Sequence, residues 1–407
     1  MTGSWKKMES NVKTALDLVR KNGGAYCKFL SANDSGENGS HQAGILISNR
    51  AMELFITEEE KRSSDIVKKP VDIIWPDGIK RRNIYTYYHS KKEARITSFG
   101  KDFKYRRPDM TGSLFIITKN DDQTYQTWFL ENADEIDEFL SDFSISATQD
   151  ELLQLLDLST LAVTEDEKLR AAIERFIATL DVDFPSTSDM ARAARQIEEE
   201  VKDHVRDIIK NPDKKILSWT NVEYELFRAL EQDRYQDFLE NGFSDIDEFV
   251  EMAKAVLNRR KSRAGKSLEH HLATIFEGNG LAFQEQVVTE GNKKPDFIFP
   301  SGKRYHDPDF PVEGLISLAS KTTCKDRWRQ VINEANRLKD RKKYLFTLQQ
   351  GISENQMMEM KEEGVVLVVP TSYISTYPKS VRDSILSLEK FIQLVRETEK
   401  KYGYPDD

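Results

Sequence analysis

The sequence predicts a two-domain protein, with a β-rich N-terminal domain and a C-terminal α/β domain built on one mixed sheet. The first 145 residues contain short runs of β-branched and aromatic residues separated by Gly, Asn and Asp. Beyond residue 278, similar runs alternate with helical segments, which is the pattern of an α/β domain. A chain of 407 residues is long enough for two or three domains with sizeable cores.

Four segments of the N-terminal domain, which we place at residues 1–150, have the composition of strands. They are residues 41–48, 71–75, 83–89 and 112–118. The polar stretch 31–40 (SANDSGENGS) is expected to form a surface loop. A buried loop would leave backbone groups without hydrogen-bond partners.

An acidic helical connector is predicted for residues 151–182. Its segments ELLQLLDLSTLAV and EKLRAAIERFIATL have helical periodicity and acidic flanks. Residues 181–187 (DVDFPST) contain a proline and capping residues, so we place the second domain at 183–407. Up to residue 278 this domain is mostly helical, and KSLEHHLATIFEGNG is predicted to be a helix that ends at glycines.

Short strands and helices alternate in the rest of the C-terminal domain. The strand-like segments are FQEQVVT, PDFIFP, LISLASK, YLFTL and VVLVVP. Helices are predicted for DRWRQVINEANRLKD and SENQMMEMKEE, and for the terminal segment PKSVRDSILSLEKFIQLVRETEKK. Together they predict one mixed sheet covered by helices.

Composition argues against several classes of protein. No run of about 18 apolar residues exists, and the charged N-terminus lacks the apolar stretch of a signal peptide. Cys27 and Cys324 are far apart, and the six histidines lack metal-ligand spacing. These features argue against a disulfide framework and a zinc site, and we expect a cytoplasmic protein.

The net charge of −9 conceals a strongly uneven distribution. Residues 120–167 contain 14 acidic and no basic side chains, which leaves +5 for the rest of the chain. Basic residues gather in NRRKSRAGK (258–266) and KTTCKDRWR (321–329). Local potential governs attraction to phosphates, so these clusters are candidate DNA contacts. Each taken alone is equally compatible with an ordinary solvated face.

Asp296 and Lys321 are spaced as in nucleases of the PD…(D/E)xK pattern. Asp296 opens the strand PDFIFP, and Lys321 closes the strand LISLASK after 24 intervening residues. Carboxylates hold Mg²⁺, and a lysine can polarise the attacking water or the phosphate. Ala319 occupies the position at which this pattern has an acid. One metal ligand is therefore missing from its usual place.

Glu334 offers a replacement for the missing acid. Trp328, Val331, Ile332, Ala335 and Leu338 form an apolar stripe at helical spacing, and Glu334 lies at its edge, directed towards the sheet. A partly buried carboxylate needs a partner, and a metal ion is one. Glu269, on the KSLEHHL helix, is a weaker candidate for a second metal or a supporting role. The plainer alternatives are a salt bridge for Glu334, a turn cap for Asp296 and a surface position for Glu269.

Three long segments closely resemble the catalytic domain of EcoRII-type restriction endonucleases: NRRKSRAGKSLEHHL, VVTEGNKKPDFIFPS and SLASKTTCKDRWRQVINEANR. The resemblance covers roughly residues 183–400. FLSANDSGENGSHQAGILI and ARITSFG resemble, in patches, the effector DNA-binding domain of that family. The resemblance implies a DNA-binding pseudobarrel for residues 1–150 and a restriction-endonuclease-like fold for residues 183–407.

The resemblance also implies functional residues. It places the catalytic residues at Asp296, Lys321, Glu334, Glu269 and Tyr305, with Mg²⁺ held by Asp296 and Glu334. It makes the missing acid at position 319 a family trait. Lys325, Asp326 and Arg327 would recognise bases, since Arg can contact guanine and Asp can accept from cytosine. Trp219 would support an extruded base, although a core position is at least as compatible with its context.

The N-terminal domain is expected to bind effector DNA. The residues at or near the family's contact positions are His41, Lys91, Lys92, Glu93 and Arg95, with added charge from Arg81 and Arg82. His41 alone would more often be a structural histidine.

The leading hypothesis is a type II restriction endonuclease that acts as a homodimer. It would cut double-stranded DNA at a short palindromic site of the CC(central base or pair)GG type. A second site on the N-terminal domain would relieve autoinhibition, and a cognate DNA methyltransferase is expected in the same system. Two alternatives are a DNA-binding regulator with an inactive nuclease fold, and a repair or structure-specific nuclease.

Overall fold

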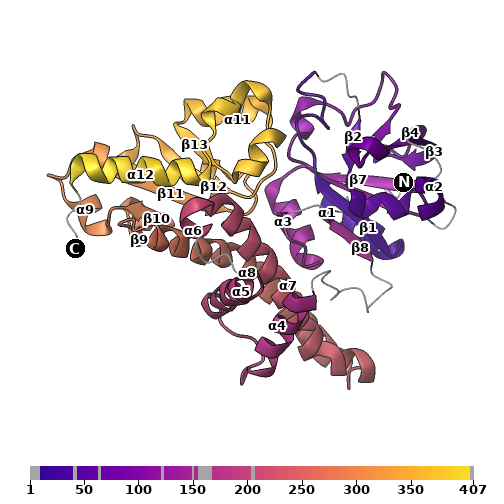
Figure 1. Ribbon diagram of the computed structural model, residues 1–407, viewed down its shortest axis with the longest axis horizontal. Coiled ribbons are helices and arrows are strands. Elements are labelled where there is room, and N and C mark those ends of the chain that lie inside the picture. The colour runs from indigo at the N-terminus through magenta and orange to yellow at the C-terminus, as the bar shows by residue number, and fades with distance from the viewer. Residues whose placement is uncertain are drawn as a thin grey trace, which may run out of the picture. The chain divides into compact units, whose positions relative to one another are not determined.

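The computed structural model describes residues 10–39, 44–62, 66–120, 123–148, 151–154, 167–202 and 207–403 (Figure 1). The chain forms two compact units. Unit 1 comprises residues 1–140 and 149–158, and unit 2 comprises residues 141–148 and 159–407. The chain thus leaves unit 1, returns to it once, and then completes unit 2.

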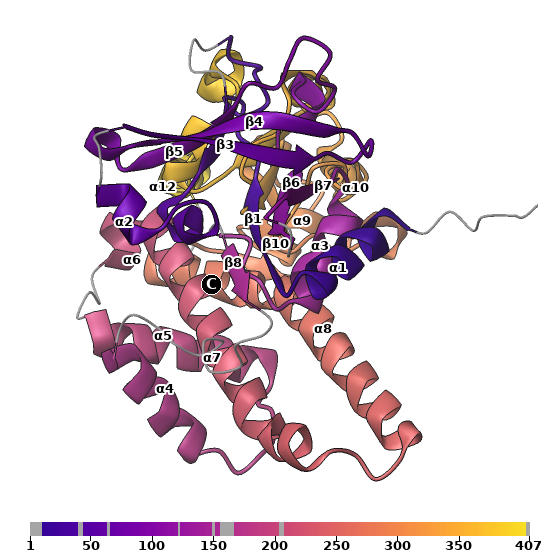
Figure 2. The same ribbon diagram turned by 90° about the vertical axis from the view of Figure 1, so that its right-hand side faces the viewer.

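Unit 1 is built on an eight-stranded sheet in the order β2-β5-β4-β3-β7-β6-β1-β8. Its strands are β1 (Gly24–Phe29), β2 (Ile45–Ile47), β3 (Ile66–Ile74), β4 (Lys80–Tyr88), β5 (Glu93–Thr97), β6 (Leu114–Lys119), β7 (Tyr125–Leu130) and β8 (Glu151–Gln154). The β3–β7 pair is parallel and the other pairs are antiparallel. Strands β3 and β4 run across the direction of β1, so the sheet curls into a half-barrel (Figure 2). All four strands expected from the sequence are present in it.

Aromatic side chains fill the inside of this curled sheet. Trp75 is buried and lies 4.5 Å from the ring of Phe103 in an edge-on contact, and Phe55 stacks on Tyr85 at 4.5 Å. The helices of the unit are α1 (Asn11–Lys21), α2 (Glu58–Arg62) and α3 (Ala133–Asp142). Asn11 of α1 accepts a hydrogen bond from the indole of Trp128 on β7 at 2.8 Å.

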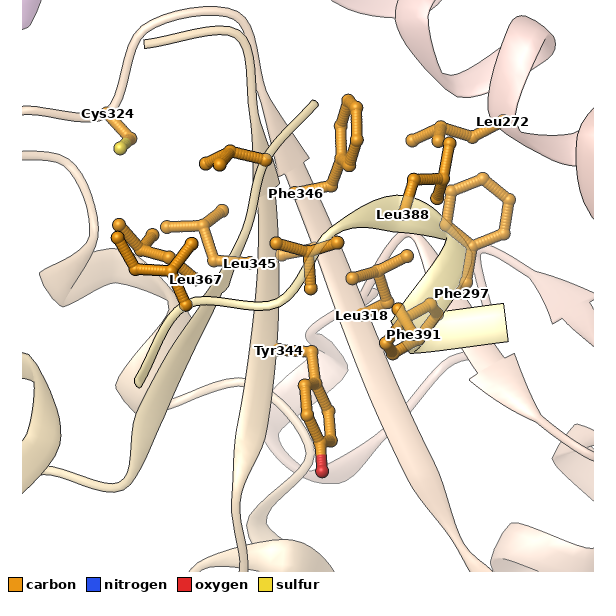
Figure 3. Packing of buried hydrophobic residues seen from close by; sticks show 14 of the residues in the cluster. Leu272, Phe297, Leu318, Cys324, Tyr344, Leu345, Phe346, Leu367, Leu388 and Phe391 are labelled. Carbon is orange, nitrogen blue, oxygen red and sulfur yellow. The ribbon is translucent and has the colours of Figure 1, made fainter. Parts of the chain in front are cut away.

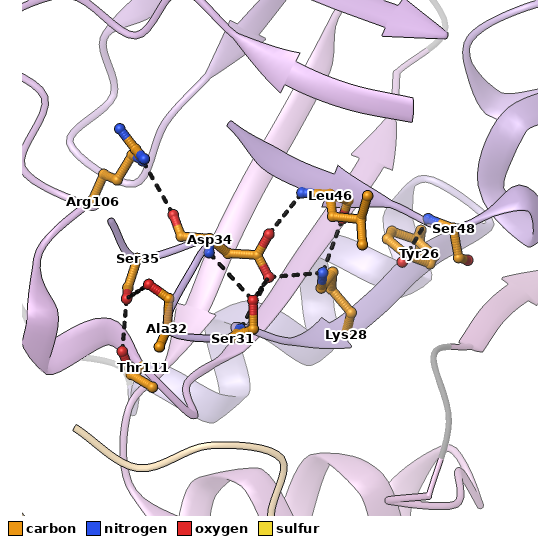
Figure 4. Close-up of polar contacts among 10 residues, drawn as sticks. All are labelled: Tyr26, Lys28, Ser31, Ala32, Asp34, Ser35, Leu46, Ser48, Arg106 and Thr111. Carbon is orange, nitrogen blue, oxygen red and sulfur yellow. Dashed lines mark hydrogen bonds and ion pairs between the residues drawn. The ribbon is translucent and has the colours of Figure 1, made fainter. Parts of the chain in front are cut away.

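The loop after β1 is partly buried, contrary to the expectation of a surface loop. Asp34 is 1% exposed, and its carboxylate accepts hydrogen bonds from the ammonium of Lys28 (2.9 Å), the backbone N–H of Leu46 (2.7 Å) and both donors of Ser31 (Figure 4). Burial raises the pKa of Asp34, but Lys28 and these donors outweigh it and hold that pKa below its usual range. Side-chain partners thus satisfy the polar groups that made burial unfavourable.

The connector begins with a strand, so the prediction of a helix for its first residues is wrong. Glu151–Gln154 form β8, which pairs with β1 in antiparallel fashion, Gly24 opposite Gln154. The apolar pattern of this segment suits either structure, and the open edge of β1 selects the strand. Residues 155–166 lie outside the described part, and the helix predicted next is α4 (Glu167–Ala178).

Unit 2 combines a helical layer with a five-stranded mixed sheet. Its longer helices are α4, α5 (Thr187–Lys202), α7 (Pro212–Asn241), α8 (Ile246–Gly278), α11 (Glu354–Glu362) and α12 (Leu388–Tyr402), and the short ones are α6 (Asp207–Lys210), α9 (Gly302–His306) and α10 (Arg329–Ile332). The sheet order is β13-β12-β11-β10-β9. The strands are β9 (Gln284–Glu285), β10 (Phe297–Phe299), β11 (Ile316–Lys321), β12 (Lys343–Thr347) and β13 (Val365–Val368). β11, β12 and β13 run parallel, whereas β9, β10 and β11 pair in antiparallel fashion, as expected for a mixed sheet.

The core of unit 2 lies between this sheet and the helices α8 and α12. Phe297 and Leu318 come from adjacent strands, and Leu272 of α8 and Phe391 of α12 pack beside them (Figure 3). Cys324 lies in the same core, and both it and Cys27 are buried. The core therefore fixes the ends of β10 and β11, where the predicted site residues lie.

Three predicted helices differ in extent. The helix predicted for KSLEHHLATIFEGNG is the second half of a longer helix, α8, which begins at Ile246 and passes through Gly265. The terminal helix begins only at Leu388, after a 3-10 turn and a bridge between Val368 and Leu386. The helix expected over 326–340 is broken into α10 and a 3-10 turn, η6 (Asn336–Leu338). Of the described helices, none is both long and apolar enough to span a bilayer.

Candidate active site

Asp296 lies immediately before β10, and hydrogen bonds from two elements fix its carboxylate. Oδ2 accepts from the backbone N–H of Ser320 at 2.7 Å and from the Ser320 hydroxyl at 3.1 Å. Oδ1 accepts from Nε2 of Gln286 at 3.1 Å. Phe297 and Phe299, which follow Asp296 on β10, pack in the core. The side chain is therefore held at the edge of the sheet.

Lys321 is the last residue of β11 and pairs with Thr347 of β12. It is half-buried, directly after the serine that holds Asp296. Its positive charge lowers the pKa values of both Glu269 and Glu334 against the effects of burial. The ammonium group therefore lies within electrostatic reach of both carboxyl groups.

Glu334 lies between α10 and η6 and is half-buried. Burial raises the pKa of its carboxyl to about 7, with a further increase from Asp296 that Lys321, Lys343 and Lys293 oppose. The stripe that predicted this position is buried: Trp328, Val331, Ala335 and Leu338 are each at most 2% exposed, and Ile332 packs partly buried. Glu334 is thus directed to the site although no continuous helix carries it.

Glu269 reaches the same site from α8. Burial raises the pKa of its carboxyl to about 7, Asp296 adds to the increase, and Lys321 opposes it. Gln286 Nε2 donates to Glu269 Oε2 at 3.1 Å and so bridges Glu269 and Asp296. Two raised carboxyl pKa values beside one lysine mark a candidate functional site, because burial and neighbouring like charges commonly shift pKa values at active sites.

The donor set of this site fits Mg²⁺. Carboxylate oxygens are the hard ligands that Mg²⁺ prefers, and the ion commonly takes only one or two protein carboxylates and keeps several waters. Within the described ranges, no three His, Cys, Asp or Glu side chains form a ready metal cage. Asp296 lies close enough to Glu334 to raise the pKa of the Glu334 carboxyl, as expected for two carboxylates that would share one cation.

Two family models match the chain in sequence order. Residues 20–148 match the N-terminal domain of restriction endonuclease EcoRII, and residues 227–392 match the EcoRII C-terminal domain. The type II restriction enzyme EcoRII of Escherichia coli is 37% identical over 405 residues, which are 93% of this chain and 95% of that enzyme. The chain belongs to the EcoRII family of type II restriction endonucleases.

Other relatives cover less of the chain. The type II restriction enzyme SsoII of Shigella sonnei is 27% identical over 161 residues, 38% of this chain and 52% of that enzyme. The structure of metal-depleted Ecl18kI in complex with uncleaved, modified DNA covers 60% of this chain and 88% of its own, with 19% identity and a TM-score of 0.46.

Tyr305, which the resemblance to the EcoRII family placed in the site, is buried beside it. Its hydroxyl donates to Glu290 at 2.7 Å and accepts from the backbone N–H of Arg337 at 3.2 Å. Burial raises the pKa of this phenol well above its usual value, and Glu290 adds to the increase. The contacts shown tie Tyr305 to the segment after Glu334 rather than to the reacting groups.

The residues predicted to recognise bases follow Lys321 in the turn that leads to α10. Lys325 is buried, at 4% exposed, whereas Asp326 and Arg327 are half-buried. Trp219 is fully buried in α7 within the main core. This placement favours the core alternative for Trp219 over a role in stacking on an extruded base.

The basic cluster 258–266 is largely used within the protein. Arg259 stacks over the ring of Phe184 at 3.7 Å, and Arg260 forms hydrogen bonds with Glu231 at 2.9 Å. Arg263 is 4% exposed and lies against the rings of Tyr224 and Phe227. Lys261 and Lys266 are exposed and remain available to phosphates.

In unit 1, four of the predicted effector-binding residues lie in or just after the turn between β4 and β5: Lys91, Lys92, Glu93 and Arg95. Lys91 and Lys92 are exposed, and Lys92 has the left-handed φ of 50° that ends the turn η2 (His89–Lys91). Nε of Arg95 lies 3.6 Å from Glu93 Oε1. Arg82 is exposed, and Arg81 forms two hydrogen bonds with Asp102. His41 lies outside the described residues.

Sequence analysis missed the residues that support the site. Gln286 was assigned to a strand, but its φ of 51° ends β9 at Glu285 and turns the side chain between two acids. Lys293 and Lys343 bind the backbone just before Glu334. Nothing in the sequence pattern marks these residues except their closeness to Asp296 and Glu334 along the chain.

Proposed function

We propose that this EcoRII-family chain is a Mg²⁺-dependent endonuclease that makes sequence-specific double-strand cuts in DNA. The observation that carries the proposal is the convergence of Asp296, Glu334 and Glu269 around Lys321. Three carboxyl groups meet there, and burial together with Asp296 raises the pKa values of Glu269 and Glu334. A divalent cation and the phosphate of DNA together complement that arrangement.

Each side chain has a distinct task in this proposal. Asp296 and Glu334 would hold Mg²⁺, and the bound ion would supply an activated water and stabilise charge on the phosphate oxygens. Lys321 orients the attacking water or neutralises a phosphate oxygen as charge develops. Gln286 donates hydrogen bonds to both Glu269 and Asp296, and through it Glu269 keeps the Asp296 carboxylate oriented. Tyr305 acts through the segment that it holds, not on the reacting atoms.

The finer features of the proposal come from the family resemblance. A homodimer, with one catalytic unit for each strand, matches a palindromic site of the CC(central base or pair)GG type. Lys325, Asp326 and Arg327 contact its bases, with Asp accepting from cytosine and Arg donating to guanine. The N-terminal residues 1–150 bind a second site through Lys91, Lys92, Glu93, Arg95 and His41, and this relieves autoinhibition. A cytoplasmic location and a cognate DNA methyltransferase, which belongs to the same system without direct contact, complete the proposal.

Plasmid digestion tests the proposal. The full chain, with Mg²⁺ and plasmids that carry one or two candidate sites, should give discrete bands, and sequencing of the fragment ends should define the site and the cut position. Asp296→Ala and Lys321→Ala should abolish cleavage and retain DNA binding. Cutting of branched or damaged DNA without sequence preference would indicate a repair nuclease. Binding without cutting by the wild type would indicate a regulator.

Second-site regulation is tested separately. A plasmid with one site should be cut slowly, and an added oligonucleotide duplex with the same site should accelerate the reaction. Reversal of the two exposed charges in Lys91→Glu/Lys92→Glu should remove the acceleration and leave the catalytic site intact. Equal rates on one-site and two-site plasmids, with or without the duplex, would refute regulation.

A further inference from the structure

The segment that carries Glu334, residues 332–337, has little regular structure of its own. α10 ends at Ile332, and η6 begins only at Asn336. Between them, Ala335 has a left-handed φ of 52°, a conformation that residues with a side chain rarely adopt. Such a backbone persists only where surrounding contacts hold it. An acid at Ala319 would be fixed by neighbouring strands, whereas Glu334 needs other support.

Two lysines bind consecutive carbonyl groups directly before Glu334. The ammonium of Lys343 donates to the carbonyl of Ile332, and the ammonium of Lys293 donates to the carbonyl of Asn333 at 2.9 Å. The last carbonyls of a helix have no partner within that helix, and lysine ammonium groups are suitable donors to them. These bonds therefore fix the end of α10 from two sides.

The far end of the 332–337 segment is held by the turn that contains Lys293. The Glu290 carboxylate accepts from the hydroxyl of Tyr305 at 2.7 Å, and that hydroxyl accepts from the backbone N–H of Arg337 at 3.2 Å. Burial raises the pKa of Glu290, but Tyr305 and the nearby N–H groups of Arg337 and Asn336 outweigh it and lower that pKa. The turn is itself closed because the carbonyl of Lys293 accepts from both the N–H (2.8 Å) and the hydroxyl (3.1 Å) of Thr289. One turn thus contacts the segment on both sides of Glu334.

Lys343 reaches the 332–337 segment from the strand β12. It is the first residue of β12, its backbone N–H donates to Gly364 at 2.9 Å, and only 3% of it is exposed. A buried ammonium group is costly without partners, and the carbonyl of Ile332 provides one. Both lysines also lie close enough to Glu334 to favour its ionised form.

We propose that Lys293 and Lys343 are positioning residues that hold the 332–337 segment so that the Glu334 carboxylate meets the metal bound by Asp296. The inference rests on the proposed role of Glu334 as a metal ligand. It explains how a ligand moved off the sheet keeps a fixed geometry. Two ammonium groups from separate elements, β12 and the turn before Asp296, substitute for the strand neighbours that the usual ligand position would have.

Metal binding by the full-length protein, measured by calorimetry with Mn²⁺, tests this proposal without cleavage. Lys293→Met keeps the aliphatic chain and removes the ammonium. We expect its Mn²⁺ dissociation constant to rise about tenfold or more, as for other groups that orient metal ligands. The Mg²⁺ concentration for half-maximal cleavage should rise in parallel, while DNA binding in EDTA stays the same. Lys293→Arg should restore much of the affinity.

Exposed neighbours supply matched controls. Lys294→Met and Lys342→Met remove an ammonium one residue away from Lys293 and Lys343, and both should leave Mn²⁺ affinity unchanged. Lys343→Met should behave like Lys293→Met. If the buried substitution prevents folding, the Lys293 variants decide the question.

Unchanged Mn²⁺ affinity in folded Lys293→Met would overturn the positioning role. A wild type that binds Mn²⁺ but cuts no DNA would refute the proposed function, and the Mn²⁺ comparison would still decide the lysine roles. A wild type with no Mn²⁺ affinity would overturn both.

Discussion

Asp296, at the start of β10, accepts two hydrogen bonds from Ser320, the residue before Lys321 on the neighbouring strand. The pairing of β10 with β11 therefore fixes the spacing between the Asp296 carboxylate and Lys321. Ser320→Ala removes the 3.1 Å hydroxyl bond and leaves the 2.7 Å amide bond. We expect cleavage at limiting Mg²⁺ to fall about tenfold. Cleavage rates across a Mg²⁺ titration would show this, and loss as complete as in Asp296→Ala would contradict it.

Metal affinity should increase with pH through neutrality. Burial, with Asp296, raises the pKa values of Glu269 and Glu334 to about 7, and a ligand must lose its proton to bind a metal ion. We expect the Mn²⁺ affinity to rise roughly tenfold per pH unit below pH 7, for one proton released, and to level off above it. In Glu269→Gln the remaining carboxyl should still produce a pH dependence. A flat profile for the wild type between pH 5.5 and 7 would contradict this expectation.

The same two carboxyl groups should make the metal-free protein less stable as pH rises. Their pKa values are higher in the folded protein than the ordinary value of 4.5, so between about pH 4.5 and 7 the folded state binds more protons than the unfolded state. Stability from these groups is therefore lost as pH rises through 7. The double variant Glu269→Gln/Glu334→Gln lacks this loss. Between pH 5 and pH 8, the melting temperature of the double variant in EDTA should rise relative to that of the wild type. A constant difference between the two melting temperatures would argue against the raised pKa values.

Substitution of Trp219 should affect stability rather than base specificity. The indole is fully buried within the core of unit 2. Trp219→Ala should lower the free energy of unfolding by about 3–5 kcal/mol, measured by urea denaturation. Trp219→Phe should keep most of that stability and cut the same sites at a similar rate. A change of central-base preference in Trp219→Phe would instead support a role in base extrusion.

The Lys28–Asp34 pair should hold the loop after β1 in place. Both side chains are at most 6% exposed, and the Asp34 carboxylate also anchors the N–H of Leu46. Asp34→Ala leaves a buried ammonium with fewer partners and should cost about 3–5 kcal/mol in the stability of unit 1. Hydrogen exchange should then show lost protection at the Leu46 amide. Exposed Asp109→Ala is a suitable control, and equal protection in both variants would contradict the prediction.

Sequence periodicity located the buried surface near Glu334 better than it located the helix. Val331 and Leu338 are buried as predicted, because burial depends on which side chains are apolar. Continuity of the helix depends on contacts from distant residues. The carbonyls before Glu334 bond to Lys293 and Lys343, and Ala335 turns left-handed, so α10 ends at Ile332. Such contacts have no local signature.

Other differences have the same origin. KSLEHHLATIFEGNG was predicted as a helix of its own, but it is the second half of α8, which runs unbroken through Gly265. Arg263, just before that glycine, lies against the rings of Tyr224 and Phe227. Tertiary packing outweighs the modest preference of glycine against helices. The placement of Asp296 and Lys321 at strand ends was predictable, because short apolar strands flank them and strand geometry fixes the direction of their side chains.

The pairing of β8 with β1 determines where the chain can be divided into fragments. A fragment that ends at residue 150 would lack β8 and leave β1 as an open edge, with unpaired backbone groups available to other chains. A fragment that continues past Gln154 would keep that edge covered, but it would also carry residues 141–148, which belong to unit 2 and bond there through Arg228 and Tyr373. Neither half can therefore be excised at a single cut without taking a piece of the other.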